Sequence, residues 1–273
     1  MKKILLTLIL TLVSVYAVSQ TSMTSVLSLN QEREYKTKRP QKIVETNIFY
    51  NSSGKQIEKN TKTFDEAGML LLEERTDETG NLITRLTYVN DTINRLKLSR
   101  TVERWTKLRG YSKETAYISY DENKFLVNWT DKDINGKTRY ETVISCNTQG
   151  DPIEISLIDG NGNPFGKETA TYNYDSNEVI IKIFSNKGIQ LSERTTTINP
   201  TIEHLFKKDG YIYNEQGDII KFIDAVTRTG YSYEYTYDTY GNSTEQKIYK
   251  ITFKKNGKEK RTIDRIFRKT YVY

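Results

Sequence analysis

The segment that decides the fold reads Tyr231-Ser-Tyr-Glu-Tyr-Thr-Tyr237-Asp-Thr-Tyr-Gly241-Asn242. Every odd position from Tyr231 to Tyr237 is tyrosine, and this period of two is typical of a β-strand with one aromatic face. The residues that follow end the strand, because Asp at the start of a turn hydrogen-bonds forward to the backbone and Gly241 supplies a positive φ. The segment therefore predicts a strand followed directly by a tight turn.

Copies of this strand-and-turn unit recur along the chain. The plain copies begin with an aromatic residue and end with a glycine that we expect to form the turn, namely Gly54, Gly68, Gly217, Gly241 and Gly257. In two degenerate copies the glycine is missing, and Asn123 and Asn177, one place earlier, are expected to adopt the positive φ. Gly54 and Gly68 lie 14 residues apart, and Gly80 follows after 12 more, which leaves strands of about eight to ten residues.

These units predict an all-β chain, an extended antiparallel meander of repeated hairpins that forms a single curved or partly rolled sheet. Residues 179–184 are apolar on both faces and predict a strand that is covered on each side. Residues 95–109 combine basic residues with apolar residues at helical spacing. A short amphipathic helix and an irregular strand pair both fit that segment.

The N-terminus has the features of a secretory signal peptide. Lys2 and Lys3 precede an apolar run that is too short to span a ~30 Å hydrocarbon core, and small residues allow cleavage after Ala17 or, as we favour, after Ser19. We therefore expect a signal peptide over residues 1–19, a disordered or loosely held leader over 20–42 and a β-repeat domain over 43–273.

Export would take the protein to the periplasm, the outer surface or the medium. No cysteine lies near either cleavage position, so we expect no N-terminal lipoprotein anchor. No later segment approaches 18 consecutive apolar residues, so no transmembrane helix is predicted.

The composition argues against several kinds of site. About a third of the residues are apolar, which is low for a large, deeply cored enzyme. A single cysteine, Cys146, excludes an internal disulfide and a Cys-based zinc site, and the single histidine, His204, lacks a partner for a metal site or a proton shuttle. Asp159-Gly-Asn-Gly-Asn163 begins like a calcium loop but has Pro164 at the sixth position, so a hairpin turn is the better interpretation. We expect no cofactor and no metal.

The excess of positive charge is modest. The chain has 41 Lys and Arg against 35 Asp and Glu, a net charge of +6, and without residues 1–19 the balance is 39 against 35. Basic residues concentrate in residues 95–113 and 247–269. In an exported protein, protection of sheet edges or surface adhesion explains them better than binding of nucleic acid.

The tyrosine row is the most suggestive functional feature. Tyr231, Tyr233, Tyr235 and Tyr237 are candidate ligand-contacting residues, because a row of phenol rings suits sugars or extended peptides. The alternative is that the rings pack against cross-strand neighbours and stabilise a sheet with little aliphatic core.

The Tyr-Asp-x-x-Gly-Asn motif at residues 237–242, together with the looser turns over most of residues 45–260, resembles the YD repeat of RHS-type proteins. The resemblance implies long β-sheets that curl into shells. It also implies a relation to small exported bacterial proteins, many of which have no assigned activity.

Three functions are compatible with these features. We expect a non-enzymatic exported repeat protein, a binding or structural module at the cell surface or in the periplasm, with an envelope polysaccharide or another exported protein as partner. The second hypothesis is an outer-membrane β-barrel, because the chain ends with Tyr271-Val-Tyr273 as a barrel-terminal strand does. The third is a hydrolase that uses a carboxylate pair such as Asp131 with Asp133 or Glu73 with Glu74.

Overall fold

The computed structural model describes residues 22–29, 38–52, 54–199, 210–224, 226–254 and 256–273. These residues form a single sheet of seventeen antiparallel strands and one short helix, α2 (Met23–Leu29). The strands are β1 (Lys42–Asn51), β2 (Gly54–Phe64), β3 (Leu70–Thr76), β4 (Leu82–Asp91), β5 (Leu96–Thr106), β6 (Gly110–Tyr120), β7 (Leu126–Asp133), β8 (Thr138–Cys146), β9 (Pro152–Asp159), β10 (Pro164–Asn173), β11 (Glu178–Ser185), β12 (Gln190–Thr197), β13 (Tyr211–Tyr213), β14 (Ile219–Asp224), β15 (Thr229–Tyr237), β16 (Ser243–Phe253) and β17 (Glu259–Val272).

The two ends of the chain join two meanders into this sheet. Strands β2 to β12 form one run of hairpins and β13 to β17 form another, and β1 pairs with both β2 and β17. Among the described residues β12 pairs only with β11 and β13 only with β14, so the sheet stays open between β12 and β13. The predicted all-β fold, a single curved antiparallel sheet, is confirmed.

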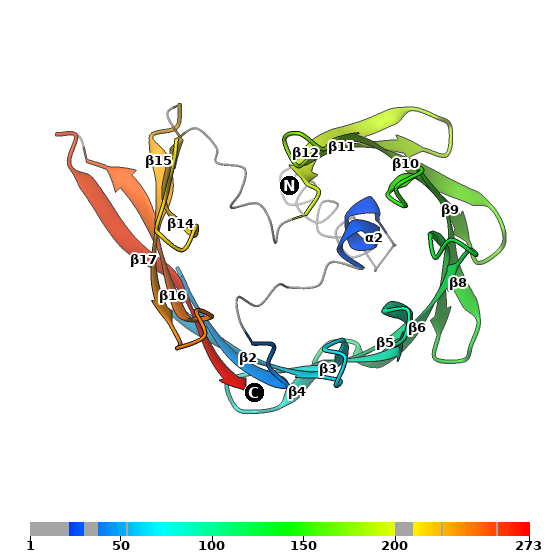
Figure 1. Ribbon diagram of the computed structural model, residues 1–273, viewed down its shortest axis with the longest axis horizontal. Helices are drawn as coiled ribbons and strands as arrows, with labels where there is room; N and C mark the ends of the chain where they lie inside the picture. The colour runs from blue at the N-terminus through cyan, green and yellow to red at the C-terminus, as the bar shows by residue number, and fades with distance from the viewer. Residues whose placement is uncertain (1–21, 30–37, 53, 200–209, 225, 255) are drawn as a thin grey trace, which may run out of the picture.

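The sheet bends around helix α2, which lies on its inner face (Figure 1). Met23, Val26 and Leu29 are spaced three apart on the helix and are all buried, because this stripe packs on an apolar patch of β6 to β11. Glu168 on β10 accepts a hydrogen bond from the Met23 amide at 2.9 Å. Part of the leader expected over residues 20–42 is therefore a docked helix. The signal peptide over residues 1–19 lies outside the described residues.

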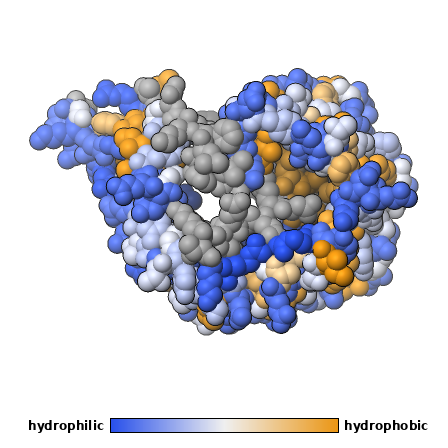
Figure 2. Space-filling model, in the orientation of Figure 1, coloured by the Kyte–Doolittle hydropathy of each residue, from blue (hydrophilic) through white to orange (hydrophobic). Residues whose placement is uncertain are grey.

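The two faces of the sheet differ in polarity. Figure 2 shows hydrophobic residues gathered inside the curve on the side of α2 and mainly hydrophilic residues around the outside. Strand alternation places several ion pairs on the outer face: Arg85–Glu74, Lys167–Glu154, Lys182–Glu193, Arg261–Glu234 and Arg268–Glu245.

Two local expectations need correction or resolution. Strand β11 is covered on one face only: Val179 and Ile181 are fully buried, whereas Ile180 on the outer face is 38% exposed. Residues 96–106 form the regular strand β5, so the segment over 95–109 is a strand rather than a helix.

Successive turns alternate between the two ends of the strands, which we call rim A and rim B. Rim A holds the turns β2–β3, β4–β5, β6–β7, β8–β9, β10–β11, β13–β14 and β15–β16, and rim B holds the turns β1–β2, β3–β4, β5–β6, β7–β8, β9–β10, β11–β12, β14–β15 and β16–β17. The five candidate turn glycines lie in these turns or at their edge with positive φ: Gly54, Gly68, Gly217, Gly241 and Gly257. In the degenerate turns Asn177 takes the positive φ as expected, but Lys124 takes it in place of Asn123.

Candidate functional site

Tyrosines at the ends of strands cover the turns of rim A. The Tyr237 hydroxyl donates to Asp218 Oδ2 at 2.5 Å and accepts from Asn214 Nδ2 at 2.8 Å, so the end of β15 holds the β13–β14 turn. Tyr174 makes the same two bonds to the β8–β9 turn, and Tyr273 makes them to the β15–β16 turn. Each of these tyrosines reaches the rim A turn that joins the two strands before its own.

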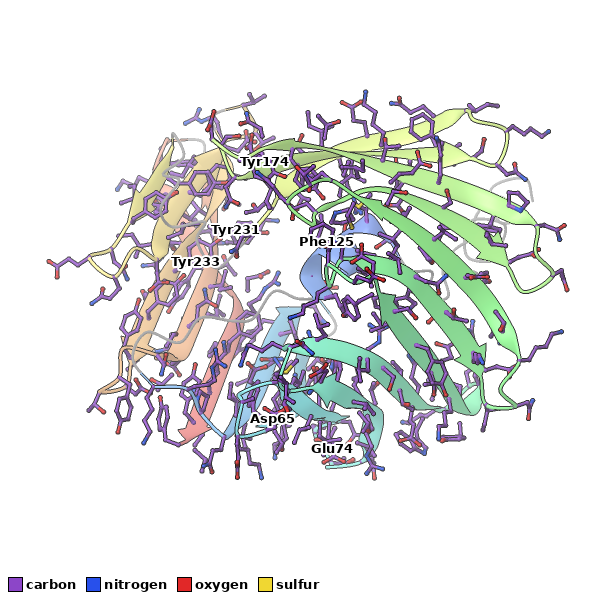
Figure 3. All side chains as sticks on the ribbon, turned by 45° about the vertical axis from the view of Figure 1, so that its right-hand side comes forward. Asp65, Glu74, Phe125, Tyr174, Tyr231 and Tyr233 are labelled. Carbon is purple, nitrogen blue, oxygen red and sulfur yellow. The ribbon has the colours of Figure 1, made fainter. Side chains whose placement is uncertain are left out.

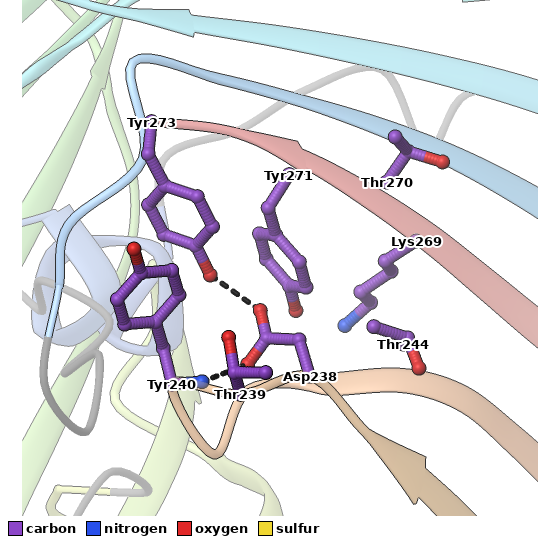
Figure 4. A pocket seen from close by; sticks show the side chains of 8 residues that line it. All are labelled: Asp238, Thr239, Tyr240, Thr244, Lys269, Thr270, Tyr271 and Tyr273. Atoms are coloured by element: carbon purple, nitrogen blue, oxygen red, sulfur yellow. Dashed lines mark hydrogen bonds between the residues drawn. The ribbon is translucent and has the colours of Figure 1, made fainter.

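Figure 4 shows the copy at the C-terminus. Asp238 accepts from the Tyr273 hydroxyl and, at 2.9 Å, from the Tyr240 amide. Slight burial opposes ionisation of Asp238, but these bonds outweigh it and lower the pKa of the carboxyl. A small pocket of about 320 Å³ lies here, and its Asp238 and Tyr273 side chains already bind each other.

The side chain two places before each of these tyrosines binds a backbone carbonyl at the edge of the same turn. Tyr172, Tyr235 and Tyr271 donate to the carbonyls of Pro152, Ile219 and Ser243. Tyr120, Cys146 and Asn90 make the corresponding bonds in other rim A turns. In a Tyr-Asp pair the tyrosine thus closes an earlier turn while the aspartate begins the next one.

Cys146 occupies one of these structural positions. Its thiol is half-buried and lies 3.4 Å from the Leu126 carbonyl. Burial, reinforced by Asp121 and Asp151, raises the pKa of the Cys146 thiol to about 11. A thiol with this pKa is a poor nucleophile at neutral pH. His204 lies outside the described residues.

In each candidate carboxylate pair, the two carboxyl groups bind different partners. Glu73 is buried and binds Arg75. Its neighbour Glu74 points to the outside of the curve (Figure 3) and binds Arg85. Asp131 accepts from the Trp129 indole, and Asp133 accepts from amides of its own turn. Asp159 likewise binds the amides of the β9–β10 hairpin, as the hairpin interpretation expects.

A buried polar cluster lies on the inner face of β1, β2 and β3. Asn60 is 7% exposed and donates to both Glu45 and Glu73, and Lys62 and Lys269 pair with Glu45. The sequence did not indicate this cluster, because its members come from four strands, β1, β2, β3 and, through Lys269, β17. Among the described residues no group of His, Cys, Asp and Glu is arranged to hold a metal ion.

An open polar site lies where β14 separates from β15. Their register runs from Asp224↔Thr229 to Lys221↔Ser232 and stops there. Tyr233 to Thr236 therefore have no strand partner on the β14 side among the described residues. The Ile219 carbonyl instead accepts from the Tyr235 hydroxyl, which bridges the two strands.

A groove of about 560 Å³ follows this separation. Its lining comes from β13, β14, β15, β17 and the β13–β14 turn: Ile212, Asn214, Gln216, Ile220, Lys221, Ser232, Tyr233, Glu234, Tyr235, Tyr237, Glu259 and Arg261. Ser232 is 7% exposed, and its hydroxyl has no hydrogen-bond partner. A buried hydroxyl without a partner is uncommon and marks a place where a ligand can complete the hydrogen bonding.

Charges at the groove compensate one another. Lys221 Nζ lies 2.7 Å from Glu259, and Arg261 lies 2.8 Å from Glu234. Arg261 also lies over the Tyr249 ring, 4.2 Å from its centroid, and its hydrogen bond lowers the pKa of Glu234. Because both cations are paired, the groove presents polar atoms with little net charge.

Three of the four candidate tyrosines border this groove. Tyr235 and Tyr237 also hold the β13–β14 turn, and burial raises the pKa of Tyr235 to about 12. Their rings stack 5.9 Å apart. Tyr233 borders the groove beside them, and Tyr231 lies next to it on β15 without belonging to the lining (Figure 3). The row therefore both stabilises the sheet and borders a site.

Comparisons with known proteins give no family. No family model and no curated protein matches the chain. Among solved structures, a porin-like protein from Bacteroides uniformis matches with a TM-score of 0.44 and 16% identity, covering 88% of this chain and 99% of that chain. The assignment to the YD repeats of RHS-type proteins is therefore wrong. In the Tyr-Asp-x-x-Gly-Asn motif that suggested it, Tyr237 binds the β13–β14 turn and Asp238 begins the β15–β16 turn. No helix in the described part of the chain is long and apolar enough to span a membrane.

Proposed function

We propose that this protein is an exported, non-enzymatic binding module of the cell envelope that holds a neutral glycan in the groove between β14 and β15. The observation that carries the proposal is the buried, unpartnered Ser232 hydroxyl in the groove lining. A volume of about 560 Å³ lies within the ~300–1,000 Å³ typical of small-ligand sites.

The chemistry of the groove fits a sugar better than a charged ligand. Ser232 and the edge of β15 that faces β14 beyond Ser232 offer hydrogen bonds in several directions, as hydroxyl-rich ligands require. Tyr233 adds an amphipathic ring. The two ion pairs leave no cation available to fix an anionic group.

The state of the reactive groups supports binding without catalysis. The carboxylates at the groove, Glu234 and Glu259, are held in ion pairs with short contacts. The pKa of Glu234 is lowered, which suits neither a general acid nor a base near neutral pH.

The test is calorimetric titration with tetrasaccharides of N-acetylglucosamine and of mannose. Ser232→Ala should weaken binding about tenfold, the loss expected for one good hydrogen bond. Ser119→Ala, on the outward side of β6, serves as a matched control and should bind as the wild type does. The proposal would be contradicted if neither sugar bound, or if the two variants bound with equal affinity. If extended peptides bound and the sugars did not, the glycan proposal would be wrong and the ligand would be a peptide.

The outer-membrane β-barrel is a second candidate, and one observation favours it. The inner face of β1 to β3 carries the buried cluster of Glu45, Asn60 and Glu73, and barrel interiors in the outer membrane are polar. Lipid-facing strands, however, need an apolar outer face, and ion pairs such as Lys182–Glu193 occupy the outer face here. Expression with the N-terminal segment followed by membrane extraction separates the candidates: the binding module is recovered without detergent, and a barrel is not.

A further inference from the structure

We propose that rim B is a docking surface for anionic lipid membranes. The proposal is independent of the groove between β14 and β15. It is based on how charge is distributed between the two rims. The rims lie at opposite ends of the strands, because successive turns of an antiparallel meander alternate between the two ends.

The turns of the two rims carry opposite charge. Among the described connecting residues, those of rim A include nine acidic and two basic residues, and those of rim B include two acidic and seven basic residues. The basic residues of rim B are Lys107, Arg109, Lys137, Lys187, Arg228, Lys254 and Lys258. The net charge of the chain, +6, conceals this polarity.

Exposed apolar side chains accompany the positive charge. Four neighbouring turns of rim B, namely β5–β6, β7–β8, β9–β10 and β11–β12, each present one at or beside the tip: Leu108 (92% exposed), Ile134 (58%), Phe165 (51%) and Ile189 (61%). Large apolar residues at turn tips gain nothing from folding, because they stay in water. They lose that exposure only when another surface covers them.

Basic residues together with exposed apolar residues favour a membrane over a soluble polyanion as the partner of rim B. The connecting residues of these four hairpins include Lys107, Arg109, Lys137 and Lys187 and no acidic residue. Asp133 and Asp159 directly precede two of the turns, and each accepts hydrogen bonds from turn amides. Basic residues attract an anionic lipid surface, and neighbouring apolar tips enter its interfacial layer. A polyanion would use the charges alone.

The experiment is flotation of the protein with phosphatidylglycerol-containing vesicles, with pure phosphatidylcholine vesicles for comparison. We expect binding only to the anionic vesicles and a decline of binding at high salt. The variant Lys107→Gln/Arg109→Gln/Lys137→Gln/Lys187→Gln should lose at least tenfold in partition coefficient. The variant Leu108→Ser/Ile134→Ser/Ile189→Ser should also lose about tenfold, although its charge is unchanged.

Rim A supplies the matched control. Ile93 is 91% exposed in the β4–β5 turn, and Ile93→Ser should leave vesicle binding unchanged. Circular dichroism of each variant establishes that it is folded. Vesicle binding that survives the triple serine substitution, together with equal affinity for soluble polygalacturonate, would show a polyanion site and overturn the proposal. Absence of binding to anionic vesicles would overturn it as well.

Discussion

At the scale of the residue, the tyrosines have two roles that the sequence could not separate. The alternation from Tyr231 to Tyr237 correctly indicated a shared face, and Asp and Gly correctly indicated the turns. Which hydroxyl meets which turn depends on strands two apart in the sheet, and local sequence contains no such information. Ser232 was missed for the same reason, since its burial depends on the strands on both sides of it, with Lys221 opposite it on β14 and Tyr249 on β16.

Removing one hydroxyl tests the structural role. Tyr237→Phe removes a donor to Asp218 and an acceptor for Asn214, so we expect a loss of about 1 to 2 kcal/mol in the free energy of unfolding. Tyr231→Phe should change the stability by less than about 0.5 kcal/mol. Urea unfolding followed by circular dichroism measures both, and equal stability of the two variants would contradict the turn-closing role.

The thiol of Cys146 provides a pH-dependent test. Its pKa is raised from 9.0 to about 11, so at pH 8 the thiolate fraction is roughly a hundredfold below that of an ordinary thiol. The unfolded chain releases this proton first, so stability falls as the pH rises above about 9. Alkylation by iodoacetamide should be slow at pH 8 in the folded protein and fast in urea. Rapid alkylation of the folded protein at pH 8 would contradict the burial.

At the scale of the element, the hairpins can be predicted from the sequence, but packing between elements distant in the chain cannot. Strands from β2 to β12 pair with their sequence neighbours, so turn spacing and period-two patterning suffice to predict them. Helix α2 cannot be predicted in this way. Seven residues with Met23, Val26 and Leu29 on one side form too short a helix to be stable alone, and the apolar inner face of the sheet supplies its stability. Strand β5 replaces the alternative helix for a related reason, since its residues pair with both β4 and β6.

At the scale of the whole molecule, the curved sheet depends on contacts between the two ends of the chain. Strand β1 lies between β17 and β2, with registers from Lys42↔Val272 to Phe49↔Arg265 on one side and from Lys42↔Thr63 to Asn51↔Gly54 on the other. Nothing in the spacing of the turns indicates this pairing. A meander without it would place β1 and β17 far apart.

Removal of β17 therefore should divide the molecule. Deleting residues 259–273 eliminates the pairing of β16 with β17 and of β1 with β17, and these are the contacts that tie β13–β16 to the rest of the sheet. We expect β13–β16 to become sensitive to protease while β2–β12, which keep their own hairpins and helix α2, resist digestion. Mass spectrometry of the protected fragments measures the outcome. An insertion of Gly-Ser-Gly in the exposed turn at residues 186–188 lengthens a hairpin without breaking a ladder and should leave the whole sheet protected. Protection of β13–β16 in the deletion variant would mean that contacts other than the β17 ladders hold the open sheet together.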